Sequence, residues 1–192
     1  SLSRWLVREP EMPLVDLSPP ITPNSPHWAD NRGFERAARW NLVNSDSVNV
    51  GTITTSGHIG SHIDAPAHVR AGAPTIEDIP LLSCVGACLV LDVSDEVDHS
   101  SSPHGAVSAP NLRSRISPFP DVMPIRRLLL RHQRSAKRHW DPDMPGLDPA
   151  FIRWFGEQGG CLIGVDLDSF DPERSTALVA HHEAIYWNIV ML

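Results

Sequence analysis

The sequence lacks the features of membrane, secreted and nucleic-acid-binding proteins. No apolar run approaches the ~18 residues of a membrane-spanning helix, and the longest, Cys84 to Val93, is typical of a buried strand. The opening residues SLSRWLVREPEMP do not have the basic-then-apolar order of a secretory signal. The net charge of −7 gives no electrostatic reason to expect nucleic acid or an anionic membrane as partner. These absences predict a cytoplasmic protein without either partner.

Cysteine is scarce as well. The three cysteines form an odd set in apolar surroundings, which predicts buried thiols at Cys84, Cys88 and Cys161 rather than disulfides, a metal pair or a nucleophile. No G-x-S-x-G sequence occurs, which argues against a serine hydrolase. The chain of 192 residues, 41% hydrophobic and 20% charged, is typical of one globular domain.

What the chain does have is a dense histidine motif, GHIGSHIDAPAHV, from Gly57 to Val69. The side chains of His58, His62, Asp64 and His68 are of the types that zinc prefers. The alternative is a polar surface loop in which the histidines occur by chance. We therefore predict a metal site in this segment.

The spacing of the motif restricts its backbone. On a helix, Asp64 would point ~200° away from His62, at ~100° per residue. In a flat strand the Cα atoms of His58 and His62 would lie ~13 Å apart, too far for one ion. We expect an extended segment that bends at Gly60 and turns again at Pro66, so that the four side chains converge.

The rest of the sequence predicts an α/β fold in one domain of mixed strands with a few packed helices. Asp148 as N-cap and Pro149 begin a predicted helix that Gly159 and Gly160 end. A second helix is expected over 175–187, and 94–124 is expected to be a loop with one helical turn near 111–115. Strands are expected at 14–17, 49–56, 85–93, 125–131 and 161–165.

Three segments together resemble one family. HIGSHIDAPAH (58–68) resembles the pattern HxGTHxDxPxH of the metal-dependent cyclases. DLSPPITPNSPHW (16–28) and IGVDLDSFDPERSTALVAHH (163–182) resemble the opening strand and second signature of the kynurenine formamidase branch. The resemblance implies a swivelling β/β/α fold over 1–192, with 1–13 as an N-terminal extension. It also implies a homodimer that hydrolyses N-formyl-L-kynurenine, a small aryl formamide, to L-kynurenine and formate.

The resemblance also implies a role for each site residue. His58, His62, Asp64 and His181 would bind two divalent metal ions, Zn²⁺ or alternatively Mn²⁺, with Asp64 bridging them. His68 would be the proton donor and acceptor, and Trp28 would stack on the substrate ring. The alternatives are that Trp28 is an ordinary core or surface residue and that His181 lies on a helix surface. The remaining histidines outside the motif are expected to be solvated, namely His27, His99, His104, His132 and His139.

The sequence departs from the family pattern at three places. Ser61 replaces a threonine, and Ala-Asp follows Trp28 in place of Pro-Gly-Asp. The family's last ligand is a glutamate twelve residues after the late histidine, which would be residue 193. The sequence is thus expected to be truncated at its C-terminus and to bind its metals weakly or not at all unless a nearby carboxylate substitutes for that glutamate. Two alternative functions remain. One is hydrolysis of a cyclic amide, as by an isatin hydrolase, and the other is that of a non-catalytic metal-binding scaffold.

Overall fold

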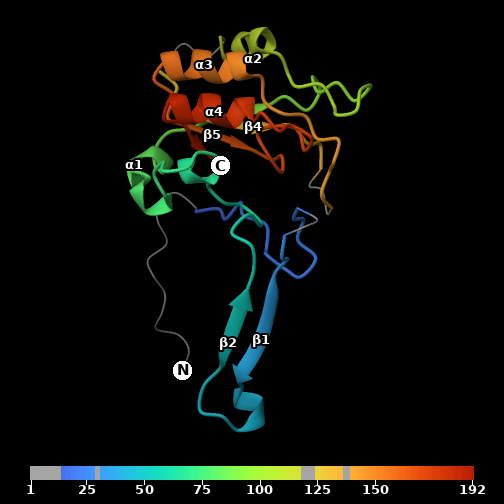
Figure 1. The fold of residues 1–192 in the computed structure, drawn as a ribbon, viewed down its shortest axis with the longest axis vertical. Helices are drawn as coiled ribbons and strands as arrows, with labels where there is room; N and C mark the ends of the chain where they lie inside the picture. Colours follow the sequence, from blue (N-terminus) through green and yellow to red (C-terminus); the bar gives the residue numbers. More distant parts are fainter. Residues whose placement is uncertain (1–13, 29–30, 118–123, 136–138) are drawn as a thin grey trace.

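A computed structural model of the protein describes residues 14–28, 31–117, 124–135 and 139–192. The predicted N-terminal extension, 1–13, lies outside the described residues. The chain forms a parallel sheet covered by helices and a hairpin that projects from it (Figure 1). The α/β class predicted from the sequence is confirmed. No helix within the described residues is both long and apolar enough to cross a membrane.

The sheet consists of four parallel strands in sequential order, and its middle strands are apolar. Its members are β3 (Leu89–Asp92), β4 (Arg127–Arg131), β5 (Leu162–Val165) and β6 (Val190–Met191). Leu128 and Leu130 of β4 are buried because alternate residues of a strand point to the same face. The predicted strands at 125–131 and 161–165 are confirmed as β4 and β5.

The predicted buried strand from Cys84 to Val93 is wrong in its first half. The chain forms a short helix, α1 (Leu81–Cys84), and enters the sheet only at Leu89. Val85 is 69% exposed, because it lies on a connection outside the sheet. The prediction of buried thiols is correct for Cys161 only, since Cys84 is half-buried and Cys88 is exposed.

Three helices lie together over one face of the sheet (Figure 1). They are α2 (Ala109–Ile116), α3 (Pro149–Glu157) and α4 (Val179–Tyr186). Asp148 caps α3 as predicted, accepting the N–H of Ala150 at 2.9 Å, and its second oxygen accepts the N–H of Ala109 at 2.7 Å. One carboxylate thus joins the starts of α2 and α3. The helix α2 is longer than the single turn predicted, since Leu112 and Ile116 pack into the core.

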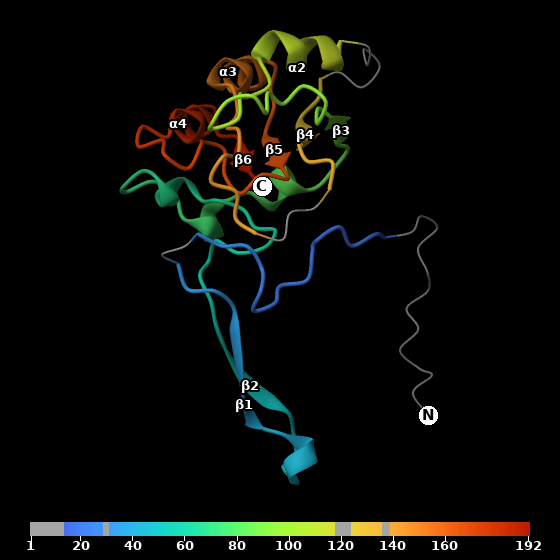
Figure 2. The same ribbon diagram turned by 90° about the vertical axis from the view of Figure 1, so that its right-hand side faces the viewer.

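The hairpin consists of β1 (Glu35–Trp40) and β2 (Val50–Thr54), joined through the 3₁₀ turn η1 (Leu42–Asn44). It extends away from the sheet and its helices, and both views show this (Figures 1 and 2). All six residues of β1 are exposed. The sequence predicted β2 but not β1.

The strand predicted at 14–17 is absent. Leu14 is 91% exposed and Leu17 is 80% exposed in irregular chain, so these apolar side chains have no sheet to pack against. Two further 3₁₀ turns, η2 (Pro66–His68) and η3 (Ile76–Asp78), lie between the hairpin and α1.

Candidate metal centre

The histidine motif follows the bent path expected from its spacing. Gly60 has φ +64°, and a side chain there would place its Cβ 2.8 Å from Cγ1 of Ile21. The turn after the motif is η2, which begins at Pro66. Between the two bends, the N–H of Asp64 donates to the carbonyl of Met191 at 3.0 Å. The motif is therefore attached to β6, and the predicted bends are confirmed.

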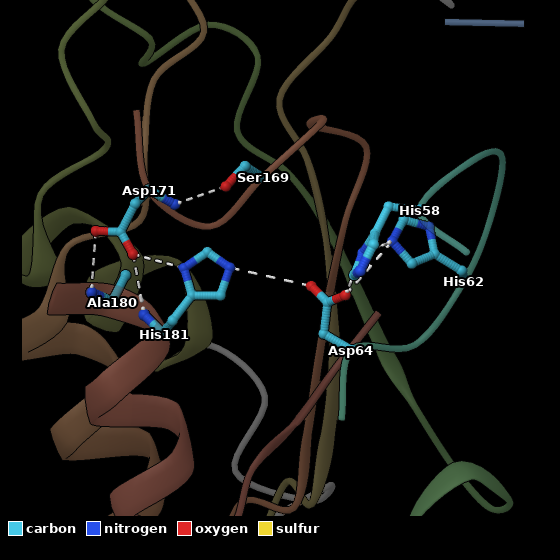
Figure 3. A network of polar contacts seen from close by, with 7 residues as sticks. All are labelled: His58, His62, Asp64, Ser169, Asp171, Ala180 and His181. Carbon is cyan, nitrogen blue, oxygen red and sulfur yellow. Dashed lines mark hydrogen bonds and ion pairs between the residues drawn. The ribbon is translucent and has the colours of Figure 1, made fainter. Parts of the chain in front are cut away.

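Three motif side chains converge on one point (Figure 3). His58 Nδ1 lies 3.0 Å from Asp64 Oδ1, His62 Nε2 lies 3.5 Å from the same oxygen, and the two nitrogens are 3.3 Å apart. A tetrahedral ion with bonds of about 2.0 Å holds its ligand atoms about 3.3 Å apart. His62 Nδ1 donates to the carbonyl of Gly60 at 2.8 Å, which leaves Nε2 to accept. This is the spacing that a divalent ion needs.

His181 approaches the other oxygen of the same carboxylate. Its Nε2 lies 4.0 Å from Asp64 Oδ2, while its Nδ1 contacts Asp171 Oδ2 at 2.6 Å (Figure 3). The carboxylate of Asp171 sets the orientation of the ring and leaves Nε2 directed at Asp64. A carboxylate behind a histidine in this way is the usual second partner of a metal-binding imidazole.

Asp171 also determines where α4 begins. Leu178 precedes the helix with φ +44° and has no side-chain acceptor, so the first N–H groups of the helix need another partner. Asp171 accepts the N–H of Ala180 at 3.1 Å and that of His181 at 3.0 Å. The cap explains why α4 begins at Val179 and not at the predicted residue 175. It also buries His181, which is 3% exposed and not on the helix surface.

The polar atoms at the centre fit a bound cation. Asp64 Oδ1 is buried and has no hydrogen-bond partner of acceptable geometry among the described residues. A buried carboxylate oxygen without a donor costs free energy unless a cation compensates it. His58, His62 and Asp64 Oδ1 form one potential ligand group, and His181 with Asp64 Oδ2 forms a second.

His68 completes the cluster. Its ring centroid lies 4.2 Å from that of His58 and 6.1 Å from that of His181. One of its nitrogens lies within 4.8 Å of ligand atoms of both His58 and Asp64. His68 is thus placed equally well to be a ligand or a proton carrier, and its predicted role stays a prediction.

The proximity of these groups shifts their pKa values. Burial alone would raise the pKa of Asp64, but the close approach of His62 and the other nearby histidines outweighs it and lowers the pKa. The close approach of the Asp64 carboxylate raises the pKa of His62 against the effect of burial. Burial is the main cause of the lowered pKa of His68. The carboxylate is therefore ionised and ready to bind a cation.

Trp28 lies against another aromatic residue. Its ring meets Trp140 edge to face at a centroid distance of 5.0 Å, and Trp140 Nε1 donates to Glu173 at 2.6 Å. This pair leaves the predicted contact between Trp28 and a substrate ring untested.

Two of the important residues were missed or misread in the sequence. Asp171 has no predicted role, although it lies within the segment 163–182, after a predicted strand and ten residues before His181. His132 was predicted to be solvated and is 3% exposed. It follows β4 directly and continues the buried alternation of Leu128 and Leu130, a signal present in RLLLRH. The other four histidines that were predicted to be solvated are half-buried or exposed: His27, His99, His104 and His139.

Comparison with known proteins places the chain in a family. The family described as "Putative cyclase" matches residues 15–172, and the chain belongs to it. The kynurenine formamidase of Bordetella petrii is 34% identical over 169 residues, which cover 88% of this chain and 76% of that protein. The kynurenine formamidase of Bordetella avium is 34% identical over 179 residues, covering 93% and 80%.

Solved structures agree on the fold. An isatin hydrolase bound to the product analogue thioisatinate superposes with a TM-score of 0.72 at 17% identity, over 93% of this chain and 77% of that one. A potential metal-dependent hydrolase with cyclase activity superposes with a TM-score of 0.69 at 18% identity, over 92% and 78%. At these identities the likeness establishes the cyclase-like fold.

Proposed function

We propose that this protein is a metal-dependent amidohydrolase that converts N-formyl-L-kynurenine to L-kynurenine and formate. The observation that carries the proposal is the position of the Asp64 carboxylate, with one oxygen at His58 and His62 and the other 4.0 Å from His181 Nε2. The names of the two Bordetella relatives support the choice of substrate.

The ligand set suits two divalent ions. His58 and His62 would hold one ion with Asp64 Oδ1, and His181 would hold the other with Asp64 Oδ2. Imidazole and carboxylate ligands favour Zn²⁺, with Mn²⁺ as the alternative. When bound, such ions polarise a carbonyl and lower the pKa of water from about 15.7 to roughly 7.

His68 supplies the proton transfer in this proposal. An aryl amide nitrogen leaves poorly until it is protonated, so a group must move the proton of the attacking water to that nitrogen. The His68 ring lies beside His58 and within reach of the cluster. Trp28 would stack on the aryl ring of the substrate and orient its formyl group.

The projecting hairpin supports the proposed homodimer. An isolated two-stranded sheet is marginally stable in water, and this hairpin exposes 49% of Trp40, 88% of Val43 and 62% of Ile53. A second copy of the chain that covers these side chains would stabilise it. We propose that the dimer acts in the cytoplasm.

The direct test is turnover by purified protein supplied with Zn²⁺ or Mn²⁺. The proposal expects formate and kynurenine from N-formylkynurenine, loss of the activity with a chelator, and recovery when the metal returns. Isatin is the comparison substrate. A kcat/KM for isatin above that for N-formylkynurenine would assign the protein to the cyclic-amide hydrolases. Absence of turnover of either substrate by a preparation shown to contain metal would indicate a non-catalytic scaffold.

A further inference from the structure

A cavity lies at the edge of the sheet where three strands end, apart from the metal centre. A cavity of about 180 Å³ is lined by residues that follow β3, β4 and β5, among them Val97, His132 and Leu167. Ligands of open α/β sheets bind beyond the carboxyl ends of the strands. Sites for drug-sized ligands measure about 300–1,000 Å³, so this cavity suits a ligand of only a few atoms. None of the metal-centre residues lines it.

The main anomaly of the cavity is His132. Its side chain is 1% exposed, and neither ring nitrogen has a hydrogen-bond partner of good geometry in the described part of the chain. Nδ1 lies 3.5 Å from Asp166 Oδ1, so Nε2 is the nitrogen left for a ligand. A buried polar ring without partners costs stability, and native proteins retain such groups where something else satisfies them.

The charge balance of the lining favours an anion. Among the described residues, those that line it include one arginine and three histidines but neither aspartate nor glutamate, and its polar members are His99, His104, His132, Gln133, Arg134 and Ser135. Arg134 forms no ion pair with any residue that the structure describes. The nearby Asp166 is compensated, because it accepts the N–H of His132 at 2.6 Å and that of Gln133 at 3.0 Å.

A metal ion fits this cavity less well, although imidazoles line it. Within the described residues, His99, His104 and His132 do not form a group with ligand atoms close enough to share one ion. His104 Nδ1 donates to the carbonyl of Ser101 at 3.0 Å. A guanidinium in the same lining repels a cation.

We propose that this cavity is a binding site for a small carboxylate, held by the Arg134 guanidinium and by a hydrogen bond from Nε2 of His132. A carboxylate accepts two parallel bonds from a guanidinium, and the apolar side chains of Val97 and Leu167 accommodate its short carbon end. The inference rests on the cavity and does not depend on the proposed function.

The test is titration of the full chain with sodium acetate and, separately, with sodium formate, followed by ¹H–¹⁵N NMR at constant ionic strength. Saturable shifts are expected at the amides of Gln133 and Ser135. Arg134→Gln should weaken binding at least tenfold, while Arg36→Gln, the same charge change on the projecting hairpin, should leave it unchanged. His132→Leu should also abolish binding. If His132→Leu does not fold, the result for Arg134→Gln is decisive, because Arg134 is exposed and its substitution leaves the core intact.

Three results would overturn the proposal. One is equal binding by Arg134→Gln and the unchanged protein. Another is a set of shifts confined to the amides of residues 58–68, which would place the carboxylate at the metal centre. The third is perturbation of Gln133 and Ser135 by Zn²⁺ but not by acetate, which would make the cavity a metal site.

Discussion

Asp171 and His181 form a buried pair in which one carboxylate oxygen accepts both the ring N–H and the main-chain N–H of the histidine, at 2.6 and 3.0 Å. The other oxygen of the same carboxylate accepts the N–H of Ala180 and so caps the first turn of α4. A single acidic residue therefore sets the position of the helix and the direction of the ring. The pair links the cap of α4 to the orientation of a candidate metal ligand.

Substitution of Asp171 should weaken metal binding although Asp171 is not itself a ligand. Asp171→Asn removes the charge behind His181, and loss of such a partner typically costs 10–100-fold in metal affinity. Competition with a chromophoric chelator measures the effect. Ser169→Ala is the matched control, because the Ser169 hydroxyl accepts the N–H of Asp171 at 3.2 Å and forms no other hydrogen bond within the described residues. Equal metal affinities for the two variants would refute a positioning role.

His68→Ala should separate the two roles open to His68. As a proton carrier, His68 contributes about 10²–10⁴ in rate, so the variant should retain its metal and lose that much kcat. Metal content by mass spectrometry and kcat are measured on the same preparation. If metal and rate disappear together, His68 is a ligand with His58 and Asp64.

Acid should destabilise the protein partly through Asp166. Burial opposes ionisation, but the hydrogen bonds from His132 and Gln133 outweigh it and lower the pKa of Asp166 below 3.8. A lowered pKa in the folded state gives stability that is present above pH ~4 and lost as the pH falls through the folded value.

Asp166→Asn should therefore reduce the free energy of unfolding at pH 7 by about 1 kcal/mol. Hydrogen bonds to charged groups contribute about 1.5–3 kcal/mol, and this value is reduced because the side chain is 38% exposed. Urea unfolding between pH 7 and pH 3 measures the effect, and the difference between the two proteins should shrink toward pH 3. A constant difference across this range would show that the charge of Asp166 is unimportant.

Gly60 should tolerate no side chain. Gly60→Ala places a Cβ against Ile21 at φ +64° and should cost about 1–2 kcal/mol of stability, with weaker metal binding because His58 and His62 lie on either side of the bend. Gly57→Ala is the control, since its Cβ would meet no atom within 4 Å. Thermal unfolding of both variants measures the loss of stability. Equal losses for Gly60→Ala and Gly57→Ala would contradict a special requirement for glycine at the bend.

The hairpin should control assembly. Ile53→Asp places a charge on its exposed apolar surface and should convert the proposed dimer to a monomer, with little effect on the metal centre. Light scattering after size-exclusion chromatography gives the mass. Thr52→Asp on the same strand is the control for charge alone. If both variants dissociate the dimer equally, the interface does not depend on a specific apolar contact of Ile53.

The sequence predicted the motif well because local spacing restricts its backbone strongly. A straight helix and a flat strand both keep His58, His62 and Asp64 apart, and Gly60 and Pro66 mark where the chain can bend to bring them together. Elements that depend on distant partners were predicted less well. Leu14 and Val85 are apolar but exposed, since whether an apolar segment is buried depends on which sheet it meets. Asp171 was missed because its partners lie nine and ten residues away, in a helix whose start it determines.

The bond between the Asp64 N–H and the Met191 carbonyl has a consequence for the order of events during biosynthesis. These two residues are separated by most of the chain, so the motif is held against the sheet only after β6 (Val190–Met191) has joined it. A chain in which β6 has not yet been synthesised contains the motif histidines but lacks the strand that holds the motif in place. If the proposed function holds, metal loading would follow the pairing of β6 with the sheet, and a bound ion would mark molecules in which that pairing has formed.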